Sequence, residues 1–381
     1  MTSDVLVVKN FAQIEEISLT FADLTVLVGP QGAGKSLALQ WLKTALDGKQ
    51  IVKALEDAGH STAGPGVMVD LIFGIGMAAA WRADSEVRFN KTKIQLKTIA
   101  KLGGDKENAL FIPAHRSMLI ADGWAQPFQK LTAETPVVAR MFSQNLFDRF
   151  NRREQGSLFP VERVLKAEYR KLINDAVFHG GTVAIEEDRQ HAKRLKLKHG
   201  ESELPFMTWT AGQREFTPLL LGLYHLLPPR KLLKQPEIDW VIIEEPEMGL
   251  HPKALNVFLL LALDLLWRGY RVVLSTHSPH VLTAVWMLQR LKDHHAHWQR
   301  ICEAFGVPPS QAMQRVAEAA LTKQYAVHLL DFNERGTVNS REISGLNPDA
   351  DNDAEAGWGG LTDFSSRFGD AVRRAVNEDG Q

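Results

Sequence analysis

Eight consecutive residues near the N-terminus have the types and spacing that a bound phosphate chain requires. They match the pattern G-x-x-x-x-G-K-S at every specified position and are Gly29, Pro30, Gln31, Gly32, Ala33, Gly34, Lys35 and Ser36. The glycines allow several backbone N–H groups to face a common point, which attracts an anion. In this pattern the lysine reaches the β- and γ-phosphates of a nucleotide, and the serine hydroxyl binds Mg2+. We therefore predict a site for ATP and Mg2+, with Lys35 as a catalytic cation and Ser36 as a metal ligand.

Two acidic residues follow a hydrophobic stretch later in the chain. Glu244 and Glu245 come directly after Val-Ile-Ile at 241–243, which is typical of a buried strand. A phosphate-loop ATPase needs one carboxylate to hold Mg2+ and another to orient or deprotonate the attacking water. We predict that Glu244 is the metal ligand and that Glu245 is the catalytic base. The alternative is a solvated acidic turn without a catalytic role.

Two further turns carry residues that suit the same chemistry. His277 follows a buried stretch at 271–275, where it can hydrogen-bond a γ-phosphate oxygen or hold the attacking water. The alternative is that it caps the following helix. A glycine-containing turn at a helix N-terminus is also an anion site, so we add four residues to the predicted nucleotide site: Thr210, Ala211, Gly212 and Gln213. Their alternative is an ordinary helix start capped by Thr210.

Short apolar strands and longer amphipathic helices alternate around these residues. Strands are expected at 24–28, 109–112, 240–243 and 271–275, and helices at 37–46, 212–227, 252–267 and 279–291. This alternation is typical of an α/β fold with a mostly parallel sheet and helices on both faces. Ligands of such sheets bind beyond the carboxyl ends of the strands. The acidic pair and His277 should therefore lie near the phosphate loop.

The regions outside this core suggest four parts. Residues 1–116 form an N-terminal lobe with antiparallel strands at 5–8 and 17–21 ahead of the phosphate loop, and a hairpin at 85–89 and 93–99. Residues 117–205 form an inserted helical subdomain, with a helical pair at 136–153 and 161–178 and strands at 182–187 and 194–198. Residues 206–343 form a C-terminal lobe that ends in a hairpin. Residues 344–381 form a tail, which is rich in Asp, Asn and Gly and mobile up to 360, with a terminal helix at 361–376.

Four motifs in this order resemble the ABC-class ATPase heads of SMC-like proteins, and most closely those of bacterial OLD and RecF-like AAA proteins. The phosphate loop is the first, and the turn at 210–214 resembles the signature motif. The run EEPEMGLHP at 244–252 resembles a Walker B motif continuing into a D-loop, and 276–278 resembles the switch histidine. The turn at 113–116 lies where the family has its Q-loop region. The resemblance covers about 1–120 and 200–290, with the strand pattern to 343, and implies an ABC-type P-loop ATPase head.

Several positions depart from the family pattern. Glu244 replaces the usual Asp as the Mg2+ partner, Gln31 stands where Asn is common, and the signature begins Thr-Ala-Gly rather than Ser-x-Gly. The chain has no long coiled coil, which excludes a chromosome-organising SMC protein. It also lacks a C-terminal acidic cluster of the TOPRIM type, which argues against a complete OLD nuclease.

The resemblance implies that two heads sandwich two ATP molecules, with each ATP held by the phosphate loop of one copy and the signature turn of the other. We expect such a head to sense or process nucleic acid, or to control a separate effector such as a nuclease or toxin, in anti-phage defence. One alternative is a RecF-like DNA-repair ATPase that acts directly on DNA. A less favoured alternative is the ATP-binding subunit of an ABC transporter.

Composition and charge bear on whether the chain binds nucleic acid or a membrane and on its compartment. The net charge of −1 over 381 residues gives no general signal for nucleic acid or membrane binding. The single cysteine and the lack of a signal-like start favour the cytoplasm. The longest apolar run, 66–81, contains Asp70 and is expected to be core rather than a membrane span. Two basic runs could contact DNA phosphates or form solvated faces: Lys91, Lys93, Lys97 and Lys101, and Lys193, Arg194, Lys196, Lys198 and His199.

Overall fold

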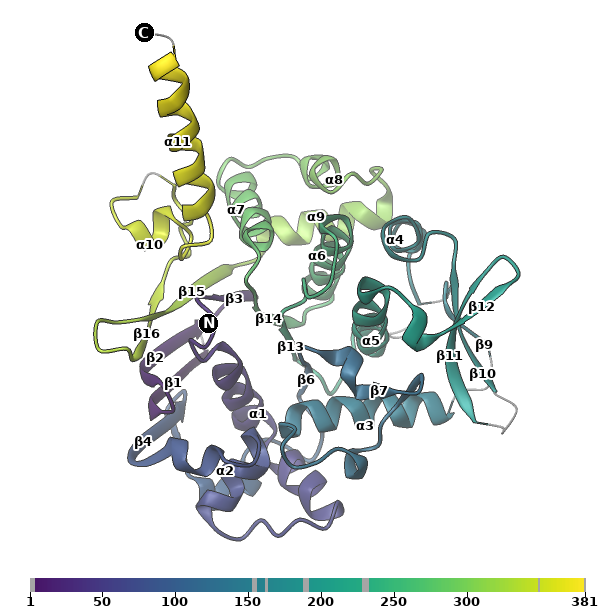
Figure 1. Cartoon of the computed structure of the whole chain (residues 1–381), viewed down its shortest axis with the longest axis vertical. Helices are drawn as coiled ribbons and strands as arrows, with labels where there is room; N and C mark the ends of the chain where they lie inside the picture. The colour runs from purple at the N-terminus through teal and green to yellow at the C-terminus, as the bar shows by residue number, and fades with distance from the viewer. Residues whose placement is uncertain are drawn as a thin grey trace.

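A computed structural model of the chain describes residues 4–152, 156–161, 164–187, 192–227, 233–348 and 350–379. Its centre is a ten-stranded sheet with the strand order β5-β4-β1-β2-β16-β15-β3-β14-β13-β6 (Figure 1). The five strands at one side are parallel neighbours: β15 (Tyr325–Phe332), β3 (Leu24–Val28), β14 (Arg271–Ser275), β13 (Trp240–Glu244) and β6 (Ala109–Ile112). The predicted parallel core is therefore confirmed.

Antiparallel strands extend this sheet on the side of the N-terminus. They are β1 (Asp4–Phe11), β2 (Ile14–Phe21), β4 (Trp81–Phe89) and β5 (Thr92–Ile94). β16 (Val338–Glu342) joins the two parts, because it pairs antiparallel with β15 and parallel with β2. The second strand of the hairpin predicted at 93–99 ends at Ile94, and a 3-10 helix follows at Leu96–Lys101. The predicted mixed sheet is otherwise observed.

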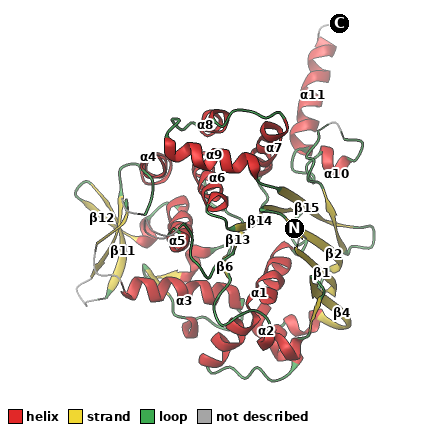
Figure 2. Cartoon of the chain, turned by 180° about the vertical axis from the view of Figure 1, so that it is seen from behind, coloured by secondary structure: helices red, strands yellow, loops and turns green. Residues whose placement is uncertain are grey.

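Successive residues of a strand face opposite sides of the sheet, and in the parallel strands the residues on both sides are apolar. Helices therefore cover both faces. Val26 and Val28 of β3 face one core, and Leu27 faces the other. The first core lies under α5 (Ala211–Leu226), α6 (Pro252–Trp267), α7 (Pro279–Asp293), α8 (Gln299–Phe305) and α9 (Gln311–Thr322). The second lies under α1 (Lys35–Asp57) and α2 (Pro65–Phe73). Figures 1 and 2 show α6, α7 and α9 on one side of the sheet and α1 and α2 on the other.

The inserted region contains the hairpin predicted at 182–187 and 194–198, as β10 and β11, but it differs from the predicted helical pair. The first helix is present as α3 (Val137–Arg152), but the second is short: α4 (Ala167–Ile173) with a π-helical turn at Asn174–Phe178. The region also contains a four-stranded antiparallel sheet, ordered β12-β11-β10-β9, at the end of the molecule away from β1 and β4 (Figure 2). Its strands are β9 (Gly156–Phe159), β10 (Thr182–Glu187), β11 (Lys193–His199) and β12 (Ser202–Pro205).

The second predicted helix was too long at its N-terminal end, because the backbone is extended at Lys166 and α4 begins only after it. Leu158 and Phe159 are buried in β9, where Phe159 pairs with Val183 of β10. The apolar residues from 161 onward have helical spacing, but the helix begins only at Ala167. Pairing with a strand that lies more than 20 residues later is a long-range contact, which the local spacing of apolar residues does not report.

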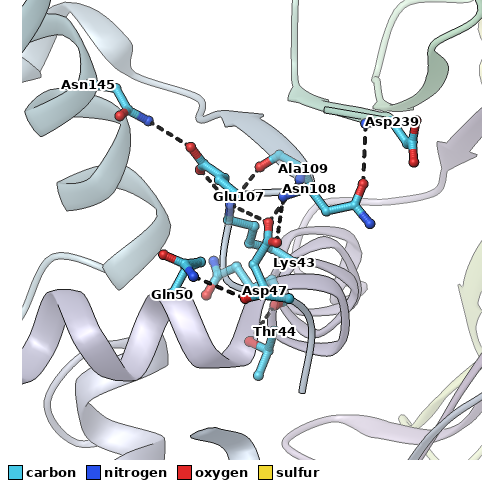
Figure 3. A network of polar contacts seen from close by, with 11 residues as sticks. Lys43, Thr44, Asp47, Gln50, Glu107, Asn108, Ala109, Asn145 and Asp239 are labelled. Carbon is cyan, nitrogen blue, oxygen red and sulfur yellow. Dashed lines mark hydrogen bonds and ion pairs between the residues drawn. The ribbon is translucent and has the colours of Figure 1, made fainter. Parts of the chain in front are cut away.

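A buried polar cluster fixes α1 against the start of β6, as Figure 3 shows. The Lys43 ammonium donates to Asp47 Oδ2 and Glu107 Oε1, both at 2.7 Å, and to the Ala109 carbonyl at 2.6 Å. The Asp47 carboxylate accepts the backbone N–H groups of Asn108 (2.7 Å) and Ala109 (2.9 Å). Asp47 has non-helical backbone angles, so α1 kinks at this residue and continues to Asp57, well beyond the helix predicted at 37–46.

The first part of the C-terminal region packs against the rest of the fold, and the last helix then extends away from it. Leu346 and Trp358 are buried, and the Trp358 indole N–H donates to the Leu346 carbonyl at 3.1 Å. A short helix, α10 (Asp353–Ala356), lies between them. The terminal helix predicted at 361–376 is α11 (Asp363–Asp379), which points away from the rest of the molecule in Figure 1. The segment at 345–360, predicted to be mobile, therefore has two buried anchors.

Candidate nucleotide site

The phosphate loop connects the end of β3 to the start of α1, as the sequence predicts. Gly29, Gly32 and Gly34 all have positive φ angles, of 141°, 79° and 85°. A Cβ atom on Gly29 would lie only 2.0 Å from the Leu330 carbonyl oxygen of β15. Glycine is therefore required there both for its backbone angle and for the close approach of the neighbouring strand. The loop ends at the N-terminus of α1, which favours a bound anion.

Lys35 is buried within this loop. Its ammonium donates to the carbonyl oxygens of Gly29 at 2.8 Å and Pro30 at 3.0 Å, so the side chain curls back over the loop. Burial lowers the pKa of Lys35 to about 8, although the nearby carboxylates of Glu245 and Glu247 oppose this shift. The charge is thus kept in a poorly solvated position where a phosphate group would be a strong partner.

The lowered pKa of Lys35 predicts that the affinity for ATP depends on pH. Bound phosphates favour the charged ammonium and raise its pKa, so binding takes up a proton when the free protein has lost it. We expect full affinity below pH 8, and a fall of up to about tenfold per pH unit above it. Titrations of ATP between about pH 6.5 and 9.5 measure this.

The matched control for this pH dependence is Lys35→Arg. Its guanidinium stays charged over the whole range, so the affinity of this variant should be nearly constant with pH. An equal decline in both proteins would contradict the assignment to Lys35, and so would a constant affinity in the unchanged protein.

Glu244 and Ser36, the two predicted metal ligands, meet at this edge of the sheet. Glu244 is the last residue of β13, and its Oε2 accepts the Ala114 backbone N–H at 3.2 Å. Burial outweighs the opposing effects of the Ala114 N–H and the nearby Ser36 side chain and raises the pKa of Glu244. Its other oxygen, Oε1, is buried without a hydrogen-bond partner in the described part of the chain. A buried, unpartnered carboxylate oxygen beside a serine hydroxyl fits a divalent cation with oxygen ligands.

Glu245 and His277 face each other across the ends of β13 and β14. Glu245 Oε1 lies 3.5 Å from His277 Nε2, and the side chains are 29% and 34% exposed, so water can reach both. Glu245 has a φ of 40°, an unusual angle for a residue other than glycine, and its N–H donates to the Ser275 carbonyl at 3.0 Å. Strained backbone of this kind occurs often at functional sites. The structure therefore brings the predicted base and the predicted switch histidine together.

Glu247 is a residue to which sequence reasoning assigned no role. Its Oε1 accepts the Thr276 hydroxyl at 2.7 Å and the His277 backbone N–H at 2.6 Å. It therefore ties the loop that carries His277 to the segment after β13. The sequence could have pointed to Glu247 only as the third glutamate of the acidic run at 244–247.

Arg116 is a second residue that the sequence left without a role. Its guanidinium is fully buried and donates to the carbonyl oxygens of Glu215 (3.0 Å), Glu244 (3.2 Å) and Pro246 (3.3 Å). Burial lowers the pKa of Arg116 to about 10, with the Glu215 carboxylate as the main opposing charge. The turn at 113–117 thus joins the start of α5 to the end of β13.

The signature-like turn has the geometry of a capped helix start. The Thr210 hydroxyl accepts the Gln213 N–H at 3.3 Å, and Gln213 Oε1 accepts the Thr210 N–H at 3.1 Å. Gln213 also donates to the Val177 carbonyl, and a Cβ on Gly212 would lie 3.0 Å from the Gly249 carbonyl oxygen. In the described part of the chain, none of its side-chain hydrogen bonds reaches residues 29–36. A nucleotide role for 210–213 stays a prediction.

The basic run on β11 is largely neutralised. Lys196 lies 3.2 Å from Glu203 and 3.6 Å from Glu186, and Lys198 pairs with the same two carboxylates. In the other run, Lys93 pairs with Glu86 at 3.0 Å. These pairs favour a solvated charged face over a DNA-binding surface at these lysines. No helix among the described residues has the length and apolar character needed to cross a membrane.

Comparisons with known proteins find a matching family model and many similar solved structures, which include two SMC heads. Residues 139–283 match a family model described as "AAA domain, putative AbiEii toxin, Type IV TA system", a range that includes 210–213, the acidic pair and His277. A crystal structure of an SMC head bound to the C-winged helix domain of ScpA is 12% identical, with 90% of this chain and 97% of that chain covered and a TM-score of 0.44. The SMC head domain from Thermotoga maritima is 14% identical, with 90% and 99% covered and a TM-score of 0.37. No curated protein matches the chain.

Proposed function

We propose that this chain, an SMC-like, ABC-class P-loop ATPase head in its fold, binds ATP with Mg2+, hydrolyses it and uses it to join two copies of itself. The observation that carries the proposal is the convergence of three strand ends. β3 leads to the phosphate loop, β13 to Glu244 and Glu245, and β14 to His277. Ligands of parallel sheets bind at this edge.

Each residue has a specific task in this mechanism. Ser36 and Glu244 would hold Mg2+, which would neutralise charge on the phosphates. Lys35 binds the β- and γ-phosphates. Glu245 orients a water molecule and takes its proton, and the neighbouring His277 hydrogen-bonds the γ-phosphate or the same water. Glu247 holds the loop after β14 against the segment after β13, and Arg116 holds the turn at 113–117 against that same segment, through the contacts described above.

The turn at 210–213 supports the joining of two copies. It begins a helix whose N-terminal N–H groups suit an anion. Among the described residues, Gln213 reaches the Val177 carbonyl, and no side-chain hydrogen bond joins this turn to the phosphate loop of the same chain. A second copy could present this turn to the ATP held by the first. ATP would then act as a switch of dimer geometry, released by hydrolysis.

Replacement of Lys35 tests the proposed function. Lys35→Ala removes a charge-assisted contact to the phosphates, so the affinity for ATP should fall by about 10- to 100-fold or more. Titration of a fluorescent ATP analogue measures this. Lys53→Ala, an exposed lysine on the same helix, is the matched control and should leave binding unchanged. Normal ATP affinity in Lys35→Ala would mean that the loop has another role.

The cellular role is a further part of the proposal. We propose control of a separate effector, such as a nuclease or toxin, in anti-phage defence and in the cytoplasm. ATPase activity that does not depend on DNA, together with a protein that co-purifies, would support it. ATPase activity stimulated by DNA, with salt-sensitive binding, would instead support the RecF-like alternative.

A further inference from the structure

A cavity of about 790 Å3 lies beside the phosphate loop, and the mechanism proposed above assigns no part of ATP to it. Gly29, Pro30 and His277 line one side of it. Asp331 and Arg341, from the β15–β16 hairpin, line another side. Residues of the C-terminal segment at 351–361 form the rest of its lining. Its volume lies within the range of small-molecule sites.

The C-terminal segment is anchored to the elements that carry the nucleotide site. Gly359, with a φ of 68°, packs so closely on β15 and β3 that a Cβ would lie 2.8 Å from Leu329 and 3.4 Å from Val28. The Trp358 ring lies 6.4 Å from that of Trp286 on α7, the helix that begins two residues after His277. The wall of the cavity is therefore a packed part of the fold.

Among the charged residues around the cavity, Arg341 is the one that suits an anion. Arg341 is the sole lysine or arginine among the described residues that line it. Its Nη1 donates to Asn352 Oδ1 at 3.4 Å, a long contact to a neutral acceptor. Asp331 and Asp351 line the same cavity and would repel an anion. A phosphate group would be a much stronger partner for the guanidinium than the amide oxygen is.

We propose that this cavity is the terminal-phosphate end of the nucleotide site and that Arg341 binds the γ-phosphate of ATP. The inference rests on the proposed function and adds a residue that lies outside the four motifs. Binding would exchange the Arg341–Asn352 contact for a charge-assisted contact to phosphate. Asp331 opposes the same phosphate, so the two residues act on ATP affinity with opposite signs.

Two charge-removing substitutions test this inference. Arg341→Gln should weaken ATP binding by about tenfold or more and ADP binding by less than about threefold, because ADP has no γ-phosphate. Asp331→Asn, which keeps the side-chain shape, should tighten ATP binding by about two- to fivefold. Arg335→Gln, on the same hairpin with a side chain that is 82% exposed, is the control and should change neither affinity. Titrations of ATP and ADP measure all three variants.

Opposite effects of Arg341→Gln and Asp331→Asn on ATP affinity distinguish phosphate binding by Arg341 from a purely structural role. If Arg341→Gln leaves ATP affinity within about twofold, or weakens ATP and ADP equally, the inference is overturned. Weaker ATP binding in both Arg341→Gln and Asp331→Asn would also overturn it, because it would indicate a disturbed fold. If ATP binding depends on Lys35 but not on Arg341, the proposed function stands and only this inference fails. If ATP binding depends on neither residue, the proposed function fails as well.

Discussion

The Glu245→Gln variant should bind ATP as tightly as the unchanged protein and hydrolyse it about 10²- to 10⁴-fold more slowly. The amide keeps the size of the side chain but cannot accept a proton from the attacking water. Because the proposed function assigns phosphate binding to Lys35 and Mg2+ binding to Ser36 and Glu244, and neither to Glu245, binding should survive. Phosphate release under steady-state conditions measures turnover, and titration of ATP measures affinity.

This variant should also trap the ATP-bound dimer. If hydrolysis separates two copies, Glu245→Gln with ATP and Mg2+ should show twice the mass of the chain in solution, while ADP should leave single copies. Glu334→Gln, an exposed glutamate in the β15–β16 turn, is the control and should hydrolyse ATP normally. Unchanged turnover in Glu245→Gln would rule out its role as the base, and a loss of ATP binding would place it among the binding residues.

Replacement of Lys43 should have the largest effect on stability, with a loss of about 3–5 kcal/mol for Lys43→Met. The Lys43 side chain is 1% exposed and that of Asp47 is 0% exposed (Figure 3). Burial disfavours the ammonium, but Glu107 and Asp47 outweigh it and raise the pKa of Lys43. Methionine fills a similar volume but leaves the buried Asp47 carboxylate and the partly buried Glu107 carboxylate without their cation. Urea unfolding of the full chain measures the loss.

Two matched variants distinguish lost charge from lost packing. Lys53→Met, an exposed lysine on the same helix, should change stability by less than about 0.5 kcal/mol. Adding Asp47→Asn and Glu107→Gln to Lys43→Met should recover part of the loss, because the buried negative charges are then removed. A loss below about 1 kcal/mol in Lys43→Met would contradict the assigned role of this cluster.

The buried cluster bears on the nucleotide site as well as on stability. Asp47 binds the backbone at the start of β6, and that strand ends just before the turn that holds Ala114 and Arg116. Ala114 contacts Glu244, and Arg116 contacts the carbonyls of Glu244 and Pro246. α1 and β6 therefore connect the phosphate loop to the acidic pair through the core as well as directly through Ser36.

The inserted region shows where sequence reasoning failed. Helical spacing of apolar residues correctly predicted α3, but the same criterion wrongly extended a second helix over 161–178. β9 and β12 were missed because they are four residues long each and are held by neighbouring strands. Short strands carry too few alternating positions to be recognised alone.

The sequence by itself determined the elements whose chemistry is local. The loop at 29–36 needs glycines at fixed spacing, a lysine and a serine, and the acids and His277 lie at the ends of apolar stretches, so spacing alone singled them out as candidates. Only the tertiary structure decided which of these side chains meet. The Ser36–Glu244 contact, the Arg116 contacts and the wall of the Arg341 cavity join residues that are far apart in the chain. Such contacts arise from the packing of the sheet and its helices, and no local pattern of residue types encodes them.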